Sequence, residues 1–310
     1  MNTNMSAVHR LAWPLAVANL VANIGIVITG GAVRLTGSGL GCPTWPRCTD
    51  ASYVAHGELG IHGAIEFGNR MLTFVLVVLA IALWVVVLID LVRSWRGTRA
   101  WRPFLIATVV LLGIPAQAVI GGITVHTDLN PWIVSLHLLV SMAIIGVCVL
   151  LLDVLRGPDR EDGGGLRRLA WLVFGAAWVV LYLGTVVTGS GPHSGDLDSR
   201  RTGLDPQVMS HVHAAAVYLL VALTLGLALV ARRQGAALVA RAAGGLLALE
   251  LAQGLLGFVQ YFTDLPEVLV GLHMLGAALV SAAVTWTLLT TLGRSRGRSR
   301  GRSRGLVSGS

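Results

Sequence analysis

The sequence predicts an all-α integral membrane protein with eight transmembrane helices, arranged as two pseudo-symmetric four-helix bundles. Three observations predict this fold: an apolar composition, an uneven distribution of arginines between the loops, and an internal repeat. Of the 310 residues, 55% are hydrophobic and only 12% are charged, whereas soluble domains carry about 25% charged residues. The mean hydropathy is +0.75. This composition excludes an ordinary water-soluble fold.

Eight apolar stretches are long enough to cross a hydrocarbon layer about 30 Å thick, which takes about 20 helical residues. They lie at residues 11–33, 63–92, 104–123, 133–155, 169–188, 209–231, 242–261 and 268–292. Strands of a membrane β-barrel would be shorter and would alternate in polarity. The first stretch is longer than the apolar core of a signal peptide and no cleavage-like site follows it, so we expect a retained helix.

The arginines predict the orientation of these helices. Every basic residue is arginine, and 18 of the 23 fall on one side of an eight-span arrangement. The positive-inside rule then places both termini in the cytoplasm of a multi-pass cell-membrane protein, with the loops 34–61 and 189–208 outside. Because the net charge of +8 follows the loops, we expect no nucleic-acid partner. The Gly-Arg-Ser units of 293–310 predict a disordered tail that contacts anionic membrane lipid.

An internal repeat divides the chain into residues 11–155 and 169–292. Gln117, Thr127-Asp128-Leu129 and His137 recur at a constant offset of 136 residues as Gln253, Thr263-Asp264-Leu265 and His273. Thr36-Gly37-Ser38-Gly39 likewise recurs as Thr188-Gly189-Ser190-Gly191. An even number of spans per half inserts both halves the same way up, so we expect them to be related by an axis along the membrane normal.

Histidines within the spans are the first candidate functional residues, because ionisable groups in a bilayer are costly. His137 and His273 share one repeat position near the outer helix ends, and His213 lies at a similar depth. Imidazoles from neighbouring helices can ligate a haem iron from both sides of its plane. Zinc is the competing metal, but its sites draw on clustered ligands that are not apparent here. His211 is an alternative to His213, which the repeat favours; His126 and His193 are expected on outer loops.

The second span carries a polar stripe that has no equivalent in the other half. His62, Glu66, Asn69 and Arg70 are spaced to share one helical face. Glu66 and Arg70 either form a satisfied ion pair or provide a catalytic acid or base with an arginine for an anionic group such as a propionate. The repeat counterpart of Glu66 is Ser210, and that of His213 is Asn69.

Cys42 and Cys48 lie close together in the loop 34–61, on the side expected to be oxidising, and predict a disulfide bond. Redox-active and structural roles are both open for this disulfide. Cys148 lies within the fourth span and is expected to be an inert apolar residue.

In combination these features resemble the haem A synthase family of cytochrome oxidase assembly. The resemblance spans residues 11–292, and its pieces are Gly31 to Gly39, the two loop cysteines, Ile65-Glu66-Phe67, Gln117 to Gly122, Leu129-Asn130-Pro131-Trp132, Leu136-His137, Thr185 to Pro192 and Leu272-His273. It implies successive hydroxylation of a ring methyl of the substrate haem O to a gem-diol, which loses water to leave a formyl group.

The resemblance also implies roles for particular residues. A haem b cofactor is expected between His213 and His273, and haem O is expected at His137 with Glu66 as the catalytic acid. Many members of the family have histidine where this chain has Asn69, and we hypothesise that His62 substitutes as ligand or that His137 is the sole ligand. Haem O synthase and oxidase assembly factors are the implied partners, and a homo-oligomer is left open. A bis-histidine cytochrome b electron carrier and a transporter are the alternative functions.

Overall fold

The computed structural model describes residues 7–93, 101–157, 160, 164–193, 195–196 and 199–293. Within them lie eight long helices: α1 (Ala7–Leu35), α2 (Gly60–Arg93), α3 (Trp101–His126), α4 (Pro131–Arg156), α5 (Gly164–Ser190), α6 (Pro206–Arg233), α7 (Ala237–Phe262) and α8 (Glu267–Thr290). All eight are long and apolar enough to cross a membrane. The predicted eight-span all-α fold is confirmed, and the chain is a multi-pass membrane protein. The predicted disordered tail, beyond its first residue, lies outside the described residues.

Two helices begin where the sequence supplies a side-chain cap followed by proline. The Asn130 side chain accepts a hydrogen bond from the backbone N–H of Trp132 at 3.0 Å, at the start of α4. Asp205 accepts one from the N–H of Val208 at 2.9 Å, at the start of α6. Such caps satisfy N–H groups that lack a partner within the helix, and proline fits the first helical position because it has no N–H to satisfy.

The turns after α3 and α7 have the same backbone conformation. Asp128 and Leu129 have φ of 51° and 55°, and Asp264 and Leu265 have φ of 57° and 56°. In each turn the leucine N–H donates to the carbonyl five residues earlier, at 2.8 Å in the first half and 2.9 Å in the second. The sequence repeat therefore extends to an uncommon local structure, because two successive non-glycine residues in the left-handed region are rare.

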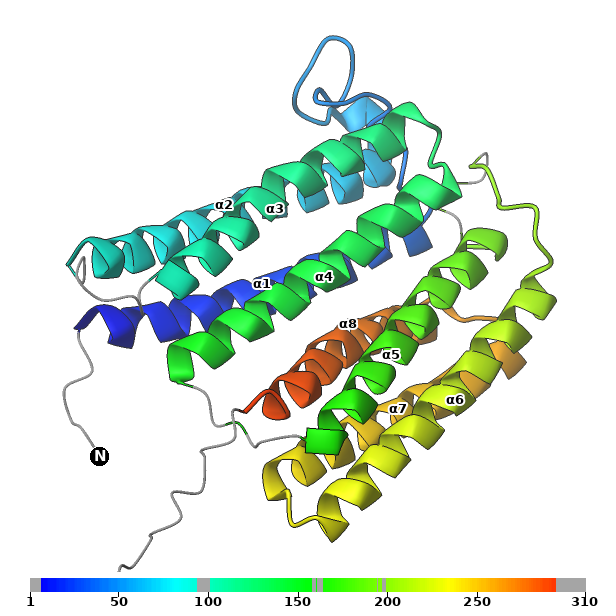
Figure 1. Cartoon of the computed structure of the whole chain (residues 1–310). Coiled ribbons are helices and arrows are strands. Elements are labelled where there is room, and N and C mark those ends of the chain that lie inside the picture. The colour runs from blue at the N-terminus through cyan, green and yellow to red at the C-terminus, as the bar shows by residue number, and fades with distance from the viewer. Residues whose placement is uncertain are drawn as a thin grey trace, which may run out of the picture.

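Each half closes into a ring of four helices (Figure 1), in which α1 contacts α2 and α4, and α3 contacts the same two; α5 to α8 repeat this order. The halves meet through α4–α8, α1–α8 and α4–α5 contacts. A buried cluster drawn from these four helices fills the joint, and its fully or nearly buried members are Val27, Met142, Ile145, Leu181 and Ala278. The axis relating the halves and the cytoplasmic position of the termini stay predictions.

One end of both rings carries the connections that matter for the site. The loops 36–56, 127–130, 191–205 and 263–266 all lie there, and we call it the long-loop end. A short 3-10 helix, η1 (Gly57–Leu59), leads from the first of these loops into α2. In Figure 1 the loop between α1 and α2 projects from this end.

Candidate functional site

Three histidines lie half-buried in the helices near the long-loop end: His137 on α4, His213 on α6 and His273 on α8. The Nδ1 atom of each is buried; those of His137 and His273 have no hydrogen-bond partner among the described residues, and the ring of His213 lies beside the backbone of Val180. Their Nε2 atoms are not fully buried. His213 and His273 are also close enough to interact electrostatically. The second half therefore brings two imidazoles together, and the first half holds one of this kind.

Each of these rings packs against a glycine on the preceding helix. A Cβ atom added at Gly121 or Gly184 would lie 3.3 Å from Cε1 of His137 or His213 respectively, and one at Gly257 would lie 3.6 Å from Cε1 of His273. Larger side chains would displace the rings. Gly184 was not singled out in the sequence, because its pairing with His213 depends on the rotation of two helices.

The predicted pair Glu66 and Arg70 is an ion pair with bonds to the cysteine loop. Glu66 is only 6% exposed; Nη2 of Arg70 donates to its Oε1 at 2.5 Å, and Nε donates to the same atom at 3.2 Å. The backbone N–H of Cys42 donates to Oε2 at 2.6 Å. Arg70 also donates to the carbonyl oxygens of Thr44 and Cys42, at 3.0 and 3.2 Å. Both carboxylate oxygens therefore have charged or backbone donors.

Cys42 and Cys48 form a disulfide, as predicted, and both are fully buried. The loop that they close rests on α3 through the indole of Trp45. This ring occupies the space that a side chain at Gly122 would need, and Nε2 of His126 hydrogen-bonds the Trp45 carbonyl at 2.9 Å. The cysteine loop is therefore fixed to α2 by hydrogen bonds with Glu66 and Arg70, and to α3 by the indole of Trp45.

Asn69 and His62 occupy different surroundings on α2. The Asn69 side-chain oxygen accepts a hydrogen bond from the Thr29 hydroxyl at 2.8 Å, which joins α2 to α1. His62 is exposed, and its Nδ1 lies 2.9 Å from the Ser38 hydroxyl. The hypothesis that His62 replaces the missing family histidine stays a prediction.

Two other outer histidines differ from these three, one in its exposure and one in its hydrogen bonding. His211 is exposed, with its ring 6.2 Å from that of Tyr261. Nε2 of His193 lies 2.9 Å from the Leu265 carbonyl, so this nitrogen carries the proton. Burial thus agrees with the repeat in favouring His213 over His211 as a ligand, and that assignment also stays a prediction.

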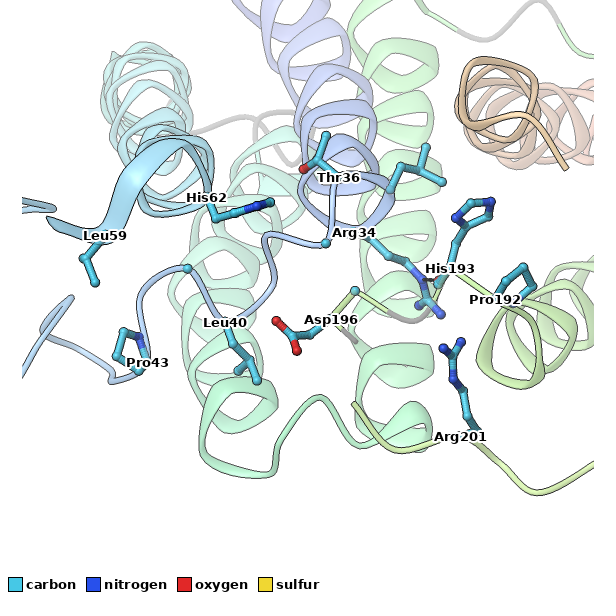
Figure 2. Close-up of a pocket in the computed structure, with 14 residues that line it drawn as sticks. Arg34, Thr36, Leu40, Pro43, Leu59, His62, Pro192, His193, Asp196 and Arg201 are labelled. Carbon is cyan, nitrogen blue, oxygen red and sulfur yellow. Dashed lines mark hydrogen bonds between the residues drawn. The ribbon is translucent and has the colours of Figure 1, made fainter. Parts of the chain in front are cut away.

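A cavity of about 700 Å³ opens between the two halves at the long-loop end. Its polar and charged walls come from both halves (Figure 2): Arg34, His62, His193, Asp196 and Arg201. Arg34 reaches from α1 to the second half. Its Nε donates to the His193 carbonyl at 2.5 Å, and its Nη2 donates to the Thr188 carbonyl at 2.9 Å. Arg34 and Arg201 are two of the five arginines that lie off the arginine-rich side. The sequence did not predict that they meet, because the cavity exists only once two distant loops come together.

Among the described residues, no group of three or more His, Cys, Asp and Glu side chains could hold a metal ion by itself. The zinc alternative therefore gains no support there. The fold and the half-buried imidazoles define a class: multi-pass membrane proteins of two four-helix units that carry histidines near one end of the helices.

The family model described as cytochrome oxidase assembly protein matches residues 13–192, more than half of the chain. The chain belongs to this family. The matched residues include His137, Glu66 and the cysteine loop, whereas His213 and His273 lie beyond them.

Curated relatives carry the name heme A synthase. The protein from Staphylococcus haemolyticus is 27% identical over 191 residues, 58% of this chain and 59% of its own length. That from Lysinibacillus sphaericus is 28% identical over 188 residues, 57% of each chain. The Listeria welshimeri protein is 32% identical over 142 residues, 44% of this chain and 43% of its own. The similarity thus spans less than two thirds of these relatives.

Proposed function

We propose that this protein is a haem A synthase, an oxidoreductase that converts the ring methyl of haem O to a formyl group for the cofactor of a terminal oxidase. The observation that carries the proposal is the difference between the two halves. His213 and His273 lie together in the second half, whereas the first combines one such imidazole, His137, with the buried Glu66. A permanent cofactor in one half and a substrate in the other would need this difference.

The second half fits a haem b cofactor. Neutral imidazole ligates haem iron through one ring nitrogen, and at His213 and His273 the buried Nδ1 leaves Nε2 as the nitrogen able to reach an iron. Because Gly184 and Gly257 have no side chain, the two rings lie close against the backbone of the preceding helices, and this contact fixes ring orientation. When bound, haem b supplies an iron centre that changes oxidation state.

The first half fits the substrate. His137 would ligate the iron of haem O, with its helix held by Gln117, whose amide donates to the His137 carbonyl at 2.9 Å. Glu66 would accept protons released as the methyl group is oxidised, because a positioned carboxylate is a competent general base. Its two donors hold the carboxylate in one orientation. Arg70 is a positioning residue for Glu66, and Asn69 and His62 complete the proposed substrate site.

The alternative function is a bis-histidine cytochrome b that only carries electrons. The proximity of His213 and His273 favours it equally, but such a carrier needs no buried carboxylate in the other half. Haem O synthase and oxidase assembly factors are proposed partners, since substrate and product must be passed on within the membrane.

The proposal is tested by expressing the chain beside a source of haem O and separating the extracted haems by chromatography and mass. We expect haem A from the wild type. Glu66→Gln, which keeps the shape of the side chain and removes its negative charge, should lose haem A while the spectrum of bound haem b persists.

Cys148→Ser is the matched control, because Cys148 is buried in α4 away from the long-loop end. It should retain haem A formation. Extracts that contain haem b but no haem A in the wild type would show the electron carrier instead.

A further inference from the structure

The cavity between the two halves contains two arginines, Arg34 and Arg201, and one carboxylate, Asp196. Neither arginine forms an ion pair among the described residues, so positive charge is in excess there. Figure 2 shows the guanidinium groups of Arg34 and Arg201 pointing toward one another. The two described ion pairs involve other residues, Glu66 with Arg70 and Asp153 with Arg160. Two like charges held together beside a cavity favour an anion between them.

Donor groups remain available on both arginines. Arg34 uses Nε and Nη2 for backbone carbonyls, and Arg201 uses Nη1 for the Gly191 carbonyl. Nη1 of Arg34 and both Nε and Nη2 of Arg201 make no hydrogen bond within the described chain. These donors suit a carboxylate, which guanidinium groups bind in a two-pronged geometry.

The size and walls of the cavity indicate more than a small inorganic anion. About 700 Å³ lies within the range of pockets that bind whole organic ligands, and Leu35, Leu40, Pro43 and Leu59 provide apolar walls. A flat apolar molecule with carboxylates along one edge would match these apolar walls and guanidinium donors. None of the three half-buried imidazoles lines the cavity, whereas His62, which belongs to the proposed substrate site, does. The cavity therefore adjoins the substrate site at its outer end and lies apart from His137, His213 and His273.

We infer that this cavity is a third tetrapyrrole site, which binds a haem-like dicarboxylate through Arg34 and Arg201 as it enters or leaves the membrane bundles. The inference rests on the proposed function, because that function supplies the class of ligand. Arg34 comes from the first half and Arg201 from the second, so the site lies where either half can be reached from the long-loop end.

The test uses the full-length protein with its bound haem b, titrated with metal-free protoporphyrin IX and, separately, with its dimethyl ester, followed by porphyrin fluorescence. We expect the dicarboxylic acid to bind about tenfold more tightly than the ester. Arg201→Gln should weaken binding of the acid about tenfold and leave the ester unchanged. Arg200→Gln is the matched control, since Arg200 is the adjacent arginine, exposed like Arg201, and does not line the cavity.

Equal affinities for acid and ester in the wild type would overturn the inference, and this comparison needs no variant to fold. Displacement of the acid by millimolar inorganic phosphate, together with equal ester binding, would indicate a phosphate or lipid-headgroup site instead. Because porphyrin binding requires neither iron nor turnover, its outcome is separable from that of the proposed function. If the wild type formed no haem A but still bound the dicarboxylic porphyrin more tightly than the ester, the proposed enzyme function would be refuted and the cavity site would stand.

Discussion

At the residue scale, Arg70 combines two structural roles. It neutralises the buried Glu66 and also donates to the carbonyl oxygens of Cys42 and Thr44 in the cysteine loop. A buried carboxylate and a loop without regular structure therefore depend on one side chain.

Replacing Arg70 with methionine should destabilise the protein strongly. Truncating one partner of a buried ion pair costs roughly 3–5 kcal/mol, because the other charge stays behind in a poorly solvated place. We expect a clearly lower Tm in detergent and faster proteolysis of the cysteine loop. Arg47→Gln removes an equal charge from the exposed side of the same loop and should change neither by much; equal effects of the two substitutions would contradict this account.

At the scale of elements, the two left-handed turns offer a comparison within one molecule. Leu129 and Leu265 share a φ near 55°, which is unfavourable for a leucine. Their side chains differ: Leu129 is 7% exposed and packs over Gly39 and Gly195, whereas Leu265 is half-buried.

Substituting glycine for the leucine should therefore lower stability in the first turn and change it little in the second. Leu129→Gly loses a buried leucine, worth roughly 2–5 kcal/mol for large-to-small core changes, and should lower Tm. Leu265→Gly gives up less burial and relieves the same backbone strain, so its Tm should stay within a few degrees of the wild type. Thermal unfolding of both variants in one detergent measures the difference, and a larger loss at Leu265 would disprove the explanation.

The sequence predicted the helices better than it predicted how they pack. Hydropathy located all eight helices because a span of about 20 apolar residues is a local signal, and the short spacing of Cys42 and Cys48 made their disulfide a local prediction too. The packing of Trp45 on Gly122, the ring of His213 on Gly184 and the meeting of Arg34 with Arg201 were not predictable. Each depends on helix rotation or on loops distant in sequence, for which a single sequence carries no direct signal.

At the scale of the whole molecule, the joint between the halves is largely apolar and has a buried polar link. The Ser281 hydroxyl on α8 donates to the Met142 carbonyl on α4 at 2.8 Å. Small residues let helix backbones approach closely in membranes, where side-chain packing replaces the hydrophobic effect as the source of association.

Cutting the chain in the loop between α4 and α5 should leave two fragments that reassemble. Co-expressed fragments carrying different tags should copurify, because each closes its own helix ring. Ser281→Leu in the second fragment should abolish copurification by forcing a bulky side chain into a fully buried position. Leu279→Ala, at a partly exposed position on the same helix, should not. Persistent copurification of the Ser281→Leu fragment would show that α4–α8 packing is not decisive.

The two halves contribute side chains of unequal size to the same joint. At matching repeat positions α4 has Met142 and Ile145 where α8 has Ala278 and Ser281, and all four are almost completely buried. Two copies of the first unit would press bulky side chains against each other, and two copies of the second would leave a void. At this joint each half is therefore matched in volume to the other half and not to a second copy of itself.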